Sequence, residues 1–156
     1  EKIQEIRRAT AVLLMRASVP GPIPLSQTKK HFAENFPEIP VFEVEVQPAN
    51  WQFRPGDRIL AVSGIANPHN FETLLKMQGV VVIPMRFPDH YMYTSSDVRR
   101  IVRLAEKMQV DNIVTTEKDF VKLKAFTARI FPLTVQVKIH PEALWKQFWQ
   151  DLFSGK

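Results

Sequence analysis

The stretch that decides the fold starts at residue 59 and reads Ile59-Leu60-Ala61-Val62-Ser63-Gly64-Ile65-Ala66-Asn67-Pro68. Four apolar residues in a row are typical of a short strand that is covered on both faces, as in parallel sheets. Gly64 permits a sharp turn and a close approach of a ligand to the backbone. Pro68 suits the first position of a helix that Asn67 caps. The free N–H groups of that helix either hold an anion or belong to a plain strand-to-helix connection.

Two more polar clusters follow short apolar runs in the same way. Phe87-Pro88-Asp89-His90 comes just past the run 80–83, and Thr115-Thr116-Glu117-Lys118-Asp119 follows the run 112–114. In open α/β sheets, ligands bind outside the carboxyl ends of the strands. If the three runs are neighbouring parallel strands, the three clusters converge on one rim of the sheet, which we call the carboxyl edge.

Helical patterns alternate with these runs, which indicates βαβ units. We therefore predict an α/β fold, a mostly parallel sheet with helices on its faces. Helices are predicted over 1–8, 26–35, 68–79 and 94–108, with a short one after 116 and a last one over 141–153. The last helix is expected to bury Leu144, Phe148 and Leu152. A buried strand is predicted over 11–17, followed by a loop over 18–24.

Two segments alternate strictly between apolar and polar residues, which is typical of half-exposed antiparallel strands. They are Val41–Val46 and Leu133–Ile139. Paired as a two-stranded antiparallel linker, they would set Lys138 near Glu43 or Glu45. The predicted organisation is a remnant of a preceding domain with the first linker strand (1–47), an α/β domain (48–132), and the return linker strand with a final helix (133–156).

The composition limits the kinds of partner and chemistry. The chain of 156 residues is 45% hydrophobic, has no cysteine and carries a net charge of +5. Without cysteine, disulfides, thiolate catalysis and cysteine-based zinc sites are excluded, and we predict no metal site. The charge favours anionic partners. Because no basic run is present, we expect no nucleic acid partner. The basic residues of 99–107 form either the solvated face of an amphipathic helix or a binding patch.

The sharpest candidate for chemistry is Asp89-His90. An imidazole titrates near neutrality and can pass a proton or orient a hydroxyl, and a neighbouring aspartate can tune it. The alternative is a surface histidine in a loop. Thr116 is expected to cap a helix, and Lys118 is expected either to meet a phosphate or to form a salt bridge with a nearby carboxylate.

These three clusters, in this order and at this spacing, resemble the C-terminal half of the tetraacyldisaccharide 4'-kinases, the lipid A 4'-kinases of Gram-negative bacteria. The resemblance runs from about Asp57 to Leu123 and includes Phe71, Tyr93 and Val121-Lys122. Tyr91 stands where many members have a second histidine, while His90 is retained. Residues 1–56 fit by position only.

The resemblance implies a transferase that moves the γ-phosphate of ATP to the 4'-hydroxyl of a tetraacyldisaccharide 1-phosphate lipid A precursor. Such enzymes act peripherally at the cytoplasmic face of the inner membrane, so the implied partners are the lipid A precursor, an anionic membrane surface and the N-terminal kinase domain. The family's ATP and Mg²⁺ sites belong to that N-terminal domain. The pattern Gly-x-x-x-x-Gly-Lys-Ser/Thr is absent from this sequence, so we expect this chain alone to bind neither and to be inactive.

The family's second-domain histidine maps to His90, which makes His90 the expected catalytic residue, with Asp89 orienting it. The residues expected to shape the rim are Ser63, Gly64, Asn67, Thr116 and Lys118. The alternative is a non-catalytic α/β module that binds a phosphorylated small molecule at the same edge.

Overall fold

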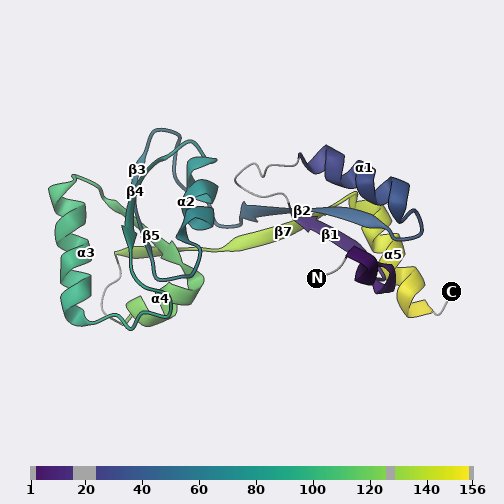
Figure 1. Cartoon of the computed structure of the whole chain (residues 1–156). Coiled ribbons are helices and arrows are strands. Elements are labelled where there is room, and N and C mark those ends of the chain that lie inside the picture. Colours follow the sequence, from purple (N-terminus) through teal and green to yellow (C-terminus); the bar gives the residue numbers. More distant parts are fainter. Residues whose placement is uncertain (1–2, 16–23, 126–128, 155–156) are drawn as a thin grey trace. The chain divides into compact units, whose positions relative to one another are not determined.

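A computed structural model describes residues 3–15, 24–125 and 129–154 (Figure 1). The chain divides into two compact units. Unit 1 combines residues 1–47 with 136–156, and unit 2 is the continuous stretch 48–135. Of the predicted segments, residues 1–2, the end of the strand over 11–17 and most of the loop over 18–24 lie outside the described residues.

Unit 1 is built on a three-stranded sheet in the order β1-β2-β7. β1 (Val12–Met15) runs parallel to β2 (Val41–Pro48), with Val12 opposite Val41. β7 (Val135–His140) borders the other side of β2 and runs antiparallel to it (Figure 1). The predicted linker strands are therefore neighbours, but the sheet has a third strand, because β1 pairs with the free edge of β2. A 3₁₀ helix over 3–8, α1 (Leu25–Asn35) and α5 (Glu142–Ser154) complete this unit.

The core of unit 1 forms where β2 meets α5. Phe42 is buried, and its ring lies 5.0 Å from that of Trp145 and 5.5 Å from that of Phe148. The prediction that α5 buries Leu144 and Leu152 is wrong, since both side chains are exposed. The helix contacts Phe42 of the sheet through Trp145 and Phe148, one turn apart, and Phe148 itself is only half-buried. Leu144 and Leu152 lie one turn before and one turn after Phe148, outside this contact.

Unit 2 is a sheet of four parallel strands in the order β4-β3-β5-β6, which confirms the predicted fold class. β6 ends at Leu133, and β7 begins only at Val135. At the break, Thr134 N–H donates to Asn50 Oδ1 (2.9 Å). The elements of the unit are β3 (Arg58–Ser63), α2 (Pro68–Lys76), β4 (Val81–Arg86), α3 (Ser95–Lys107), β5 (Asn112–Thr116), α4 (Glu117–Leu123) and β6 (Ile130–Leu133).

The central strand β3 is fully covered, as its unbroken apolar run predicts. Leu60 and Val62 share a core cluster with Ile101 and Ala105 of α3. α2 lies on the opposite side of the sheet (Figure 1) and buries Leu75. Each aliphatic side chain buried in this way contributes roughly 1.5–3 kcal/mol, more than an exposed ion pair of about 0–1 kcal/mol. The basic residues of α3 are exposed opposite this face, as expected of a solvated helix face.

Candidate functional site

The three polar clusters meet at the carboxyl edge, as the sequence predicts. In the parallel register of unit 2, Ser63 at the end of β3 lies opposite Arg86 at the end of β4. On the other side of β3, Val62 lies opposite Thr115 of β5. Because all three strands run in the same direction, the segments that follow them leave the sheet at the same edge.

Asp119 ties two of these segments together, and the sequence analysis did not single it out as a site residue. Its side chain is fully buried. Asp119 Oδ2 accepts hydrogen bonds from the Gly64 N–H (2.8 Å) and from Thr116 Oγ1 (2.9 Å). Thr116 Oγ1 in turn accepts the N–H of Asp119 (3.2 Å) and so caps α4, as predicted. The spacing Thr-x-x-Asp signals the cap, whereas the bond to Gly64 needs the folded sheet.

Gly64 is the point at which the three segments approach one another most closely. A Cβ atom at this position would lie 2.9 Å from Tyr93 Oη, 3.2 Å from the Pro88 carbonyl oxygen and 3.3 Å from Asp119 Oδ1. Glycine is therefore required by close approach and not by a positive φ. Burial, and then the nearby Asp119 carboxylate, raise the pKa of Tyr93 well above its usual value, so the phenol stays neutral.

Two predicted rim residues differ from expectation: Ser63 lies beneath the edge, and Asn67 lies on its surface without the predicted capping contact. Ser63 is buried, and its Oγ has no hydrogen-bond partner among the described residues. Asn67 is exposed at the start of α2, but its side chain makes no capping hydrogen bond, contrary to prediction. Pro68 occupies the first turn, where it needs no donor.

His90 stands at the tip of a tight turn. The Tyr91 N–H donates to the Pro88 carbonyl oxygen (3.2 Å), and His90 has a φ of 59°. Histidine is one of the few residues that adopts this left-handed conformation with some frequency. Its side chain is 77% exposed, and Nε2 lies 3.7 Å from Asp89 Oδ2. His90 is thus a surface residue in a loop, and its exposure fits both the catalytic interpretation and the alternative of a loop histidine without a role.

The Asp89 carboxylate is held by two groups, one from its own turn and one from α4. Its Oδ1 accepts the His90 N–H (2.9 Å) and lies 3.3 Å from Lys118 Nζ. Burial raises the pKa of Asp89, but the hydrogen bonds from Lys118 and from the His90 N–H outweigh it, and the net pKa lies below the usual value. Asp89 is thus ionised at neutral pH, and Lys118 forms the salt bridge that the sequence analysis gave as one alternative.

Glu72 and Arg86 form a second ion pair beside this edge. Glu72 of α2 is buried, and its carboxylate accepts two hydrogen bonds from Arg86, from Nε (2.6 Å) and Nη2 (2.8 Å). The hydrogen bond from Arg86 lowers the pKa of Glu72 more than burial raises it. A folded pKa below the unfolded one stabilises the fold above pH 4.5, and this stabilisation is lost as pH falls through the folded pKa.

Arg86→Met should reverse this pH dependence. Without the guanidinium, burial outweighs the weaker attraction of His69 and Lys76 and raises the pKa of Glu72, so the variant should lose about 1–2 kcal/mol at pH 7. The variant should regain part of the lost free energy of unfolding as the pH falls toward 5, because Glu72 then becomes protonated. The unchanged protein should not gain stability over this range. Chemical denaturation at several pH values measures both, with Arg103→Met on the exposed face of α3 as control. A pH dependence equal to that of the unchanged protein would contradict the prediction.

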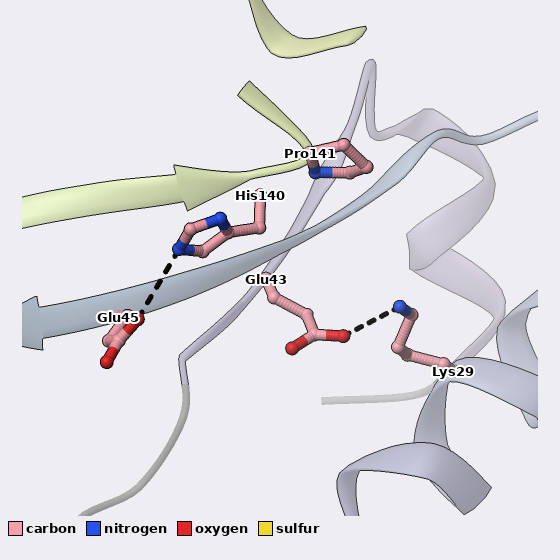
Figure 2. Close-up of a pocket in the computed structure, with 5 residues that line it drawn as sticks. All are labelled: Lys29, Glu43, Glu45, His140 and Pro141. Atoms are coloured by element: carbon pink, nitrogen blue, oxygen red, sulfur yellow. Dashed lines mark hydrogen bonds and ion pairs between the residues drawn. The ribbon is translucent and has the colours of Figure 1, made fainter. Parts of the chain in front are cut away.

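Unit 1 contains a separate polar cleft of about 380 Å³ (Figure 2). Its lining side chains are already engaged, because Lys29 Nζ lies 2.7 Å from Glu43 Oε1 and His140 Nε2 lies 3.4 Å from Glu45 Oε2. The predicted contact of Lys138 with Glu43 or Glu45 stays a prediction. His140 is half-exposed, and its contact with Glu45 links β7 to β2.

A sequence profile of the tetraacyldisaccharide-1-P 4'-kinase family matches residues 1–152. The chain belongs to this family. The match extends well beyond the segment from Asp57 to Leu123 that carries the resemblance. It therefore includes unit 1, which the sequence motifs alone did not connect to the tetraacyldisaccharide kinases.

Individual relatives agree with this family membership. The chain is 41% identical over 86 residues to the tetraacyldisaccharide 4'-kinase of Chelativorans sp. (54% of this chain, 25% of the relative). It is 35% identical over 95 residues to that of Syntrophus aciditrophicus (58% and 25%) and 41% identical over 92 residues to that of Gluconobacter oxydans (58% and 26%). It thus spans about a quarter of the length of these kinases. No solved structure matches.

Proposed function

We propose that this chain is the acceptor-side part of a kinase that phosphorylates the 4'-hydroxyl of a tetraacyldisaccharide 1-phosphate lipid A precursor. The family match supports the reaction class. The observation that supports a site at the carboxyl edge is His90, which is presented to solvent on a turn tied to the other two polar segments. Family and geometry together favour a kinase over a module that only binds a phosphorylated ligand.

In this proposal, His90 handles a proton or orients the acceptor hydroxyl, and Asp89 holds the histidine. The Asp89 carboxylate is ionised, and its Oδ2 lies 3.7 Å from the imidazole Nε2, close enough to orient the ring. Gly64, Asn67, Thr116 and Lys118 shape the surrounding edge, with Ser63 below them. A proton-handling side chain contributes typically 10²–10⁴-fold to a rate.

We place the ATP and Mg²⁺ sites in a part of the enzyme outside this sequence. The sequence has no phosphate-loop pattern. Within residues 3–15, 24–125 and 129–154, no group of three or more histidine and acidic side chains is arranged to hold a metal ion. We route no step through that ion.

The chain by itself should bind Mg-ATP no more tightly than millimolar. Phosphoryl transfer depends on a phosphate-cradling loop and on neutralisation of the phosphate charge, and this sequence has no phosphate-loop pattern. Isothermal calorimetry with the 156-residue chain measures this, with a full-length family member as the positive control. A dissociation constant in the micromolar range would show that a nucleotide site lies within this sequence.

We further propose that the enzyme acts peripherally at an anionic membrane, at the cytoplasmic face of the inner membrane. No helix in the described part of the chain is long and apolar enough to cross a bilayer. The net charge of +5 and the exposed apolar side chains of α5 (Leu144, Leu152 and Phe153) support surface contact. Sedimentation with anionic and neutral vesicles tests this, and equal recovery in both supernatants would contradict it.

A further inference from the structure

Two lysines of one helix hold the turn that carries His90. Lys118 and Lys122 are four residues apart on α4, so they lie on the same face of that helix. Lys118 Nζ reaches the Asp89 carboxylate on the N-terminal side of His90 (3.3 Å). Lys122 Nζ donates to the Tyr91 carbonyl oxygen on its C-terminal side (2.9 Å). His90 is thus bracketed by two ammonium groups that come from a single element.

The opposite side of the turn is fixed by aromatic packing. The ring of Tyr91 lies 4.9 Å from that of Phe87 and 5.4 Å from that of Tyr93. Phe87 and Tyr93 are both buried in the core cluster of unit 2. The side chains on either side of His90 are therefore anchored, whereas its own ring is not packed against the core.

We infer that Lys122 is a positioning residue for His90, a role that rests on the proposed function of this histidine. A left-handed conformation is unfavourable for a residue other than glycine, and it persists only where the surroundings impose it. Lys122 is half-buried, and its ammonium satisfies the Tyr91 carbonyl, which limits rotation of the Tyr91–Met92 peptide and so fixes the path of the chain as it leaves the turn at His90. Unlike Lys118, it contacts neither His90 nor Asp89, so it acts through backbone geometry alone.

The test compares Lys122→Met with Lys122→Arg and Lys124→Met. Arginine can still donate to the carbonyl. Lys124 is the C-cap residue of the same helix and is exposed; its backbone N–H donates to the Phe120 carbonyl oxygen (2.8 Å), and its side chain makes no hydrogen bond to the described residues. The first measurement is the ¹⁵N-relaxation order parameter of the His90 amide in the 156-residue chain. We expect about 0.85 in the unchanged chain, the arginine variant and the Lys124 control, and a fall to about 0.6 in Lys122→Met. An unchanged order parameter in Lys122→Met would overturn the inference.

The second measurement is steady-state kinetics in the full-length enzyme. Lys122→Met should lower kcat by about five- to twentyfold with little change in the KM for ATP, and Lys122→Arg should restore most of it. If the turn loosens but kcat stays the same, Lys122 still positions the turn, and it is the catalytic assignment of His90 that fails. The order parameter therefore tests the positioning role of Lys122, and kcat tests the proposed catalytic role of His90 on which it rests.

Discussion

His90→Ala in the full-length enzyme should lower kcat by about ten- to a thousandfold. The range extends below the usual contribution of a proton-transferring group, because another group is expected to act as the main base. The KM for ATP should barely change, since the histidine belongs to the acceptor side. In the 156-residue chain, the same substitution should cost under about 1 kcal/mol of stability, because the side chain is exposed.

Two further variants separate the effect of the imidazole ring on activity from that of the backbone conformation. Glycine adopts the φ of 59° without strain, so His90→Gly should lose as much activity as His90→Ala if the ring carries the effect. His90→Asn should recover little if proton handling matters, and more if the ring only orients the hydroxyl. His31→Ala, at an exposed position in unit 1, is the matched control. Activity near that of the control in His90→Ala would reject the catalytic assignment.

Asp119→Ala should destabilise unit 2 by about 3 kcal/mol, the largest stability effect we expect from a single substitution here. The substitution leaves the buried Gly64 N–H without an acceptor and removes the carboxylate to which the Thr116 hydroxyl donates. It also leaves a cavity between the segments that follow β3 and β5. Truncation of an exposed residue, by contrast, usually changes stability by less than 0.5 kcal/mol.

Hydrogen exchange measures the loss of stability separately in each unit. This matters because a chain with two units need not unfold in one step. Protection of the β3 and β5 amides should fall in Asp119→Ala, while that of β2 stays the same. Asp111→Ala, at an exposed position just before β5, should change neither. Unaltered protection in β3 would mean that the Gly64 contact contributes nothing to stability.

The sequence predicted what depends on neighbouring residues. The unbroken apolar run of β3 indicated a covered parallel strand, and Thr94 with Asp97 forms the capping box expected at the start of α3. Because the strands are parallel, the meeting of the three polar segments at one edge followed from the same patterns. These signals are local, and tertiary packing does not change them.

The sequence did not reveal contacts between residues far apart in the chain. Asp119 resembles a routine helix cap, and its bond to Gly64 spans 55 positions. Likewise, nothing near Glu72 indicates that its carboxylate is buried against Arg86 from the next strand. In α5, apolar residues occupy more of the helix surface than the small sheet of unit 1 covers, so the pattern alone did not tell which of them would be exposed.

Because unit 1 consists of two stretches of sequence with unit 2 between them, it cannot be completed during synthesis until unit 2 has been made. Unit 2 is one continuous stretch, and its two ends are already joined by the bond from the Ala49 N–H to the Thr134 carbonyl oxygen (2.8 Å). It can fold as soon as β6 has emerged. β2, by contrast, is synthesised before unit 2 but receives β7 and the ring contacts of α5 only afterwards. During this interval one edge of β2 is unpaired and Phe42 lacks its aromatic partners, which makes this strand the point of the nascent chain most in need of protection from misassociation.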